Sequence, residues 1–333
     1  MRVGLLGTGF GLAHAGIYHG HPDVESVIVF GRTPSKLEQV ATEFGFATTT
    51  DIDSIYDDPN VEMVDVCLPT PLHADHVIRA LDSGKHALCE LPLATSMPDA
   101  QRVVDTHAAS DRQVFVDMAA RFDPATEVLA TAMAAGSYGA LKMLQFSIRT
   151  ALLWEGYALG LESIAMDVLH GTLDTVASAL GRPDRITALG VAKDAGGSAA
   201  EVLLTYPGSL VGCSASALMP RPYGVRGGYL ATFSDAVLES SWTAGWDGRP
   251  AGTLTEYTDT GARELDLPQA NSYAAAIDHV LDCLAGRARS RLAPASVLDS
   301  LQLTLDVRAE LVARTATTPV RNVKPVRTRK AAR

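Results

Sequence analysis

Cysteine is scarce in this chain of 333 residues, which contains only Cys67, Cys89, Cys213 and Cys283, with no CxxC pair among them. This spacing argues against a disulfide framework and a metal centre, so we expect reduced thiols in the core and no bound metal. Long apolar runs are also absent, since no stretch approaches about 18 residues, and the N-terminus lacks the basic segment of a signal peptide. We therefore predict neither export nor membrane insertion and expect a cytoplasmic location.

The chain also lacks an excess of positive charge. Its net charge of −10 argues against nucleic acid as a partner. The exception is the segment 315–333, a basic tail without acidic residues that we expect to be flexible, with an anionic partner or a subunit contact as the alternative. The basic residues of this tail are Arg321, Lys324, Arg327, Arg329, Lys330 and Arg333. The apolar content of 47% and the length suit two domains of about 150 residues each.

A glycine-rich segment follows the first apolar run, residues 3–6. Gly7 permits a tight strand-to-helix reversal, Gly9 allows close approach of a pyrophosphate, and the following helix N-terminus offers free N–H groups to an anion. The third glycine of the G-x-G-x-x-G pattern is replaced by Leu12, whereas Gly11 lies one position early. The segment predicts a dinucleotide site, with a simple strand reversal as the alternative. The residues of this site are Gly7, Thr8, Gly9, Phe10 and Gly11.

In an NAD site, an Asp or Glu at the end of the second strand, about 20 residues after the glycine turn, binds the ribose hydroxyls. No carboxylate follows the second predicted strand here, residues 26–30. Gly31 stands there instead, and Arg32, Thr33 and Lys36 are able to donate hydrogen bonds to a 2′-phosphate. The sequence therefore favours NADP over NAD. The alternative is an ordinary solvated turn in which Thr33 caps the next helix.

Apolar strand-like runs alternate with helical patterns through the first third of the chain. This alternation predicts parallel strands joined by crossover helices, with ligands at the carboxyl ends of the strands. The predicted strands are residues 3–7, 26–30, 63–68, 86–89 and 113–117. The third strand ends in a proline-stiffened turn, whose expected cofactor contacts are Leu68, Pro69, Thr70 and His73.

Three ordered segments resemble the Gfo/Idh/MocA family of nicotinamide-dependent oxidoreductases: the glycine turn, VDVCLPTPLHADHVIRALDSGKHALCELPLA at 64–94, and VFVDMAARFDPA at 114–125. The resemblance covers nearly the whole chain. It implies an α/β fold with an N-terminal Rossmann domain over residues 1–119. It also implies a C-terminal α/β domain over residues 120–314, built on a large, mostly antiparallel open sheet.

The second half of the sequence supports this division independently, because its strand-like runs follow one another without intervening helices. One helix at about 163–180 precedes most of them. A sheet of this size leaves an apolar face uncovered, so we expect a homodimer or homotetramer. The predicted strands are residues 141–149, 185–192, 200–206, 210–217, 229–233, 236–240 and 252–257.

The chain departs from the family at a reacting position. The family's Glu-Lys-Pro motif supplies a lysine near the nicotinamide, but the lysine position is Leu91 here, and leucine exchanges no proton. Glu90 and Pro92 remain and keep the shape of this turn, so we place all three residues among the cofactor contacts.

A second departure concerns the family's Asp, His and Asp on one helix of the second domain. Asp167 and Asp174 match, but the histidine position is Gly171, and His170 lies one residue early. Asp167 and His170 are i, i+3 neighbours, so we expect an acid/base pair in which the carboxylate fixes the tautomer of the imidazole or raises its pKa. Because Asp167 interrupts an apolar run, we also expect it to have a partner or a ligand. The alternatives are a packing role for His170 and a structural salt bridge for Asp167.

The resemblance also suggests contacts to the substrate from Trp154, Tyr157 and Asp174. These observations together predict an NADP-dependent oxidoreductase that transfers hydride between nicotinamide and a secondary alcohol or ketone of a sugar, cyclitol or related polyol. One alternative is a catalytically silent regulator or pseudoenzyme that binds NAD(P) and a sugar. Another is a redox-neutral lyase, epimerase or glycosidase that uses a bound nucleotide.

Overall fold

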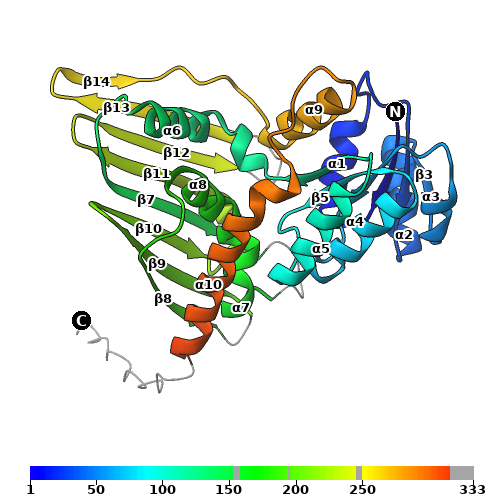
Figure 1. Ribbon diagram of the computed structural model, residues 1–333, viewed down its shortest axis with the longest axis horizontal. Coiled ribbons are helices and arrows are strands. Elements are labelled where there is room, and N and C mark those ends of the chain that lie inside the picture. The colour runs from blue at the N-terminus through cyan, green and yellow to red at the C-terminus, as the bar shows by residue number, and fades with distance from the viewer. Residues whose placement is uncertain (153–157, 194–195, 245–249, 316–333) are drawn as a thin grey trace, which may run out of the picture.

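A computed structural model describes residues 1–152, 158–193, 196–244 and 250–315 of the chain. Two β-sheets lie side by side, each covered by helices (Figure 1). The N-terminal part holds a parallel sheet and the C-terminal part a larger, mostly antiparallel one, which confirms the predicted fold class.

The parallel sheet has the strand order β3-β2-β1-β4-β5-β6. Its strand order reverses between β1 and β4, and the crevice at such a switch point is where doubly wound sheets bind ligands. The strands are β1 (Arg2–Leu6), β2 (Ser26–Phe30), β3 (Ala47–Thr49), β4 (Met63–Val66), β5 (His86–Glu90) and β6 (Val114–Asp117). The helices between them are α1 (Gly11–Tyr18), α2 (Pro34–Phe44), α3 (Asp53–Asp57), α4 (His73–Asp82) and α5 (Met97–Ala108).

The larger sheet has the strand order β14-β13-β12-β11-β7-β10-β9-β8, with a single parallel pair, β7 with β10. All seven strands predicted for this region are present. Its eighth strand, β14, was not predicted because all four of its residues are exposed and show no apolar alternation. The strands are β7 (Leu141–Thr150), β8 (Arg185–Ala192), β9 (Ser198–Tyr206), β10 (Ser209–Ser216), β11 (Val225–Phe233), β12 (Val237–Ala244), β13 (Pro250–Thr258) and β14 (Gly261–Glu264).

Helices cover one face of the larger sheet (Figure 1). The predicted helix at 163–180 consists of three consecutive segments, in which a π-helical turn separates two α-helical ones. The segments are α7 (Leu161–Ile164), the π-helix η3 (Ala165–Leu169) and α8 (His170–Leu180), and the covering is completed by α6 (Pro124–Ala135) and α10 (Leu298–Thr315).

The chain returns to the first sheet near its C-terminal end. Helix α9 (Ser272–Leu284) lies beside α1 (Figure 1), and its residues Ala276, Ile277 and Val280 belong to the core of the parallel sheet. Leu301 in α10 joins the same core. The first core is therefore completed by residues from the last fifth of the chain.

All four cysteines are free and buried, as predicted. None of the helices in the described ranges is long and apolar enough to cross a membrane.

Candidate functional site

The glycine turn lies at the carboxyl end of β1. Gly7 has φ +119°, and a Cβ added there would lie 2.4 Å from the carbonyl oxygen of Cys67, so the turn requires glycine. A Cβ on Gly11 would lie 3.2 Å from Cys67 Cβ and 3.4 Å from a methyl of Leu5. Gly11 thus provides the close contact between helix and strand that the third glycine of the pattern usually provides.

The surface of this turn is open. A Cβ on Gly9 would have no heavy atom within 4 Å, and no side chain caps the start of α1 at Phe10. Leu12 and Ala13 donate their N–H groups to the carbonyl oxygens of Gly9 and Phe10, so an anion at this helix start would meet the N–H groups that precede them. Phe10 stands beside the turn, with its ring packed against Tyr273 of α9 at a centroid distance of 5.2 Å.

The segment after β2 is tightly packed at Gly31 and exposed beyond it. A Cβ on Gly31 would lie 2.7 Å from Thr8 Cγ2 and 2.9 Å from Leu37 Cδ2. Arg32, Thr33 and Lys36 are exposed, and Thr33 makes no side-chain cap to α2. These three side chains therefore remain available to a ligand.

The two loops that follow β4 and β5 are connected by His73. Its Nε2 lies 2.7 Å from the carbonyl oxygen of Leu68 and its Nδ1 lies 2.8 Å from that of Pro92. His73 itself is buried and braces the two loops, whereas Pro69 is exposed and Thr70 is partly exposed at the start of a short 3-10 helix.

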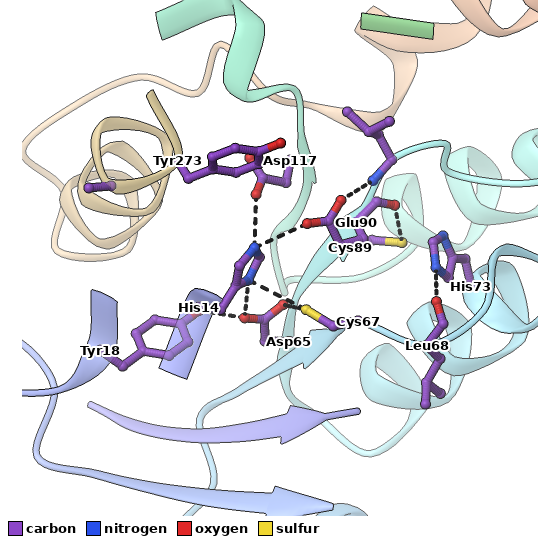
Figure 2. A network of polar contacts seen from close by, with 12 residues as sticks. His14, Tyr18, Asp65, Cys67, Leu68, His73, Cys89, Glu90, Asp117 and Tyr273 are labelled. Carbon is purple, nitrogen blue, oxygen red and sulfur yellow. Dashed lines mark hydrogen bonds and ion pairs between the residues drawn. The ribbon is translucent and has the colours of Figure 1, made fainter. Parts of the chain in front are cut away.

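A buried polar cluster lies under these loops (Figure 2). His14 of α1 places Nδ1 2.8 Å from Asp65 Oδ2 and Nε2 3.1 Å from Glu90 Oε1 and 3.2 Å from Asp117 Oδ2. Tyr18 donates a hydrogen bond of 2.7 Å to Asp65. The three carboxylates come from β4, β5 and β6, so the cluster joins α1 to three neighbouring strands.

The charges in this cluster do not balance when all three acids are ionised. Burial raises the pKa of Glu90 to about 7 and also raises that of Asp117. Burial alone would lower the pKa of His14, but Cys67, Asp65 and Asp117 raise it well above its ordinary value. The cluster therefore favours a protonated His14 and a further proton shared by Glu90 and Asp117, the two acids whose pKa is raised.

The ligand atoms of His14, Cys67 and Glu90 lie within 4.8 Å of one another, which raises the question of a metal. Both ring nitrogens of His14 face carboxylate oxygens at hydrogen-bond distance. A protonated His14 hydrogen-bonds Asp65 through Nδ1 and attracts Glu90 and Asp117 by charge at Nε2, where neither forms a hydrogen bond, whereas a metal ligand needs a free lone pair on the ring.

Sequence reasoning missed His14, Asp65 and Asp117. Asp65 and Asp117 carried a usable signal, because each is an acid at or near the end of a buried apolar strand.

His170 does not have the predicted electrostatics. It is 1% exposed, its Nδ1 lies 2.8 Å from the hydroxyl of Thr304, and burial lowers its pKa to about 4. The expectation of a raised pKa is wrong, because the loss of solvation outweighs the neighbouring charge of Asp174.

Asp167 lies in the π-helical turn and is exposed, so its burial was wrongly predicted, but it does interact with a neighbouring group, as predicted. The preceding residue, Met166, packs into the core of the first domain, which places this turn at the junction of the two domains. Asp174 is fully buried and paired with Arg121. Trp154 and Tyr157 lie outside the described residues.

Comparison with known proteins identifies the first part of the chain. Residues 1–118 match the GFO_IDH_MocA oxidoreductase family, NAD-binding Rossmann fold. Levoglucosan dehydrogenase of Pseudarthrobacter phenanthrenivorans is 36% identical over 125 residues, 34% of this chain and 31% of that protein. Inositol 2-dehydrogenase of Rhizobium meliloti is 29% identical over 150 residues, 45% of each chain. The chain thus spans less than half the length of these curated relatives.

Solved structures match over almost the full length. UDP-N-acetylglucosamine 3-dehydrogenase from Acidithiobacillus ferrooxidans has a TM-score of 0.77 at 21% identity, covering 94% of this chain and 98% of that one. A 3-ketoreductase from Actinomadura kijaniata, in complex with NADP and TDP-benzene, has a TM-score of 0.78 at 19% identity, covering 93% and 98%. At these identities the likeness concerns the fold.

Proposed function

Because the chain belongs, through residues 1–118, to the Gfo/Idh/MocA family of oxidoreductases, we propose that it transfers hydride between NADP and a secondary alcohol or ketone of a sugar, cyclitol or related polyol. The observation that carries the proposal is the open glycine turn at Gly9, which faces the uncapped start of α1 at the carboxyl end of β1. The names of the curated relatives support a cyclic polyol as the substrate class.

The cofactor is held by the glycine turn and by the segment after β2. The N–H groups around Gly9 and Gly11 suit the pyrophosphate, and Leu68, Thr70 and Leu91 lie on the loops that border the nicotinamide end. The crowding at Gly31 leaves little room for an acidic side chain, and Arg32, Thr33 and Lys36 supply donors for a 2′-phosphate. These features support NADP rather than NAD.

The cofactor, when bound, supplies the hydride chemistry. The chain must orient the substrate carbon and exchange the proton of its hydroxyl group. On the second-domain side, Asp167 is exposed at the domain junction, where its carboxylate can accept a hydrogen bond from a substrate hydroxyl. It remains a candidate for the proton exchange.

The uncovered face of the larger sheet supports a homo-oligomer. Large apolar side chains stand exposed on neighbouring strands of this face, which a second copy of the chain would cover. They are Met143 on β7, Leu189 and Val191 on β8, Leu203 on β9, Leu210 on β10 and Leu230 on β11.

A silent binding protein is the competing function, because the lysine position is Leu91 and His170 is buried with a low pKa. The two functions differ in one measurement. The purified chain is titrated with NADPH and NADH by nicotinamide fluorescence and then assayed with a panel of cyclic polyols and their ketones. Binding together with substrate-dependent change in nicotinamide absorbance supports the oxidoreductase. Binding without turnover across the panel favours the silent protein, and no binding contradicts both.

A further inference from the structure

Glu90 occupies a special position in the buried cluster. It is the neighbour of Leu91, where the family resemblance places a proton-exchanging lysine, and it ends strand β5 at the crevice of the sheet. Its Oε2 accepts the amide N–H of Leu91 at 3.0 Å, which ties the carboxylate to that loop. Its Oε1 faces Nε2 of His14 at 3.1 Å.

Exposure separates Glu90 from the rest of the cluster. Its side chain is 13% exposed, whereas those of His14, Asp65 and Asp117 are 0% exposed. Of these four side chains, Glu90 is the one that reaches the surface; its Oε1 is buried beside His14, so Oε2 is the oxygen that a proton from the crevice must reach.

We propose that Glu90 takes up the hydroxyl proton of the substrate during alcohol oxidation, in place of the side chain that Leu91 lacks, and that His14 and Asp117 are positioning residues for it. This inference rests on the proposed function. The oxidised nicotinamide, when bound, would accept the hydride from the carbinol carbon, while the O–H bond breaks, its proton passes to the Glu90 carboxylate and the carbonyl double bond forms. In the reverse direction the Glu90 carboxylic acid returns the proton to the new hydroxyl.

The surroundings of Glu90 suit this task. Burial and the nearby charges of Asp117 and Asp65 raise its pKa, whereas His14 lowers it, and the result is about 7. A group with this pKa changes its protonation state readily near neutral pH. The ionisable side chains around Glu90 are His14 and Tyr18 on α1, Asp65 and Cys67 on and after β4, His73 on α4, Cys89 on β5, Asp117 on β6 and Tyr273 on α9.

The first test compares the wild type with Glu90→Gln, using Glu25→Gln as a matched control at an exposed position. We expect wild-type kcat for oxidation to rise with pH through a single step near pH 7. Glu90→Gln should lower kcat by about 100-fold or more, abolish this step and leave NADPH affinity within about threefold. Glu25→Gln should match the wild type. A Glu90→Gln enzyme with unchanged kcat and pH profile overturns the inference.

Two further variants keep the inference testable when Glu90→Gln does not fold. Asp117→Asn removes a charge that raises the pKa of Glu90, so the step in the kcat profile should move to lower pH. Leu91→Lys should supply a proton-exchanging amine, alone in the Glu90→Gln background and beside Glu90 in the wild type. In both backgrounds the pH profile of kcat should have a different midpoint. An unmoved step in Asp117→Asn contradicts the assignment. A large loss of kcat in Asp167→Asn, with the pH step abolished in that variant and unmoved in Asp117→Asn, transfers the proton exchange to Asp167.

These outcomes separate the inference from the function on which it rests. A wild type that neither binds NADPH nor transfers hydride contradicts the proposed function. An active wild type whose pH profile is indifferent to Glu90 and Asp117 contradicts this inference alone.

Discussion

Arg121 and Asp174 form a two-point ion pair between the short helix η2 (Ala119–Phe122) and α8. The guanidinium donates from Nε to Oδ2 at 2.8 Å and from Nη2 to Oδ1 at 2.7 Å. Asp174 is 1% exposed and Arg121 is 15% exposed, so the pair is largely removed from water. Arg121 also donates to the carbonyl oxygens of Arg291 and Ser296.

This pair predicts a structural role for Asp174. Replacing Asp174 by Ala leaves the guanidinium partly buried without its counter-ion, and we expect the free energy of unfolding to fall by about 3 kcal/mol. Asp306→Ala, which breaks the exposed pair with Arg182, should cost less than about 1 kcal/mol. Urea unfolding of both variants measures the difference. A folded Asp174→Ala protein of wild-type stability with a raised substrate KM would instead support the predicted contact to the substrate.

The glycine turn predicts opposite effects at two neighbouring glycines. Gly7→Ala meets both a positive φ and the Cys67 carbonyl oxygen, so it should lower the free energy of unfolding by at least about 2 kcal/mol. Gly9→Ala points into open space and should leave stability unchanged while weakening NADPH binding by about tenfold or more. Thermal melts and fluorescence titrations check the two effects. Unaltered affinity in Gly9→Ala would mean that no pyrophosphate approaches this turn.

The exposed Arg32 predicts cofactor preference. Loss of one charge-assisted hydrogen bond costs about 1.5–3 kcal/mol, so Arg32→Ala should weaken NADPH binding by about 10- to 100-fold and leave NADH binding within about twofold. Arg185→Ala, exposed on β8 in the other sheet, serves as the control. Equal losses for both nucleotides would show that Arg32 does not read the 2′-phosphate.

His170 predicts a decline of stability in acid. Its pKa is lowered to about 4 in the folded protein, against 6.5 for the ordinary group, so the unfolded chain binds a proton more readily. The neutral form contributes fully above pH 6.5, and this contribution, about 3 kcal/mol, is lost as the pH falls from 6.5 through 4. His170→Gln should flatten the stability curve in this window, whereas His19→Gln at an exposed position should not. Identical curves for all three proteins would show that His170 is not held neutral by the fold.

The open face of the larger sheet predicts a subunit interface. Leu203 and Leu210 are each 43% exposed on adjacent strands, and a Leu203→Glu, Leu210→Glu double variant should separate the subunits. Light scattering after size-exclusion chromatography reports the mass. Val312→Glu, on the helix α10 that covers the other face, is the control. A wild type that is already a monomer contradicts the interface.

Much of the fold was predictable because periodicity reports burial. Four consecutive apolar or buried positions predicted strand β4, and the alternation of buried and exposed positions predicted strand β9. Strand β3 has three residues and is partly exposed, and β14 is fully exposed, so neither left an apolar signal.

The site was harder to predict, because its residues come from distant positions. Gly7 and Gly11 could be identified from local chemistry alone. The contact between His14 and Asp117 joins residues more than a hundred positions apart, which no local pattern encodes. The apolar neighbours of Asp167 indicated burial, but the π-helical turn directs Asp167 outward.

The return of α9 to the first sheet has a consequence for synthesis. Ile277 and Val280 fill the core of the parallel sheet, and Leu301 completes it, so a nascent chain holding only the first 119 residues lacks part of its own interior. The nucleotide-binding half therefore closes only after residue 301 has emerged from the ribosome, when all eight strands of the second sheet have already been made.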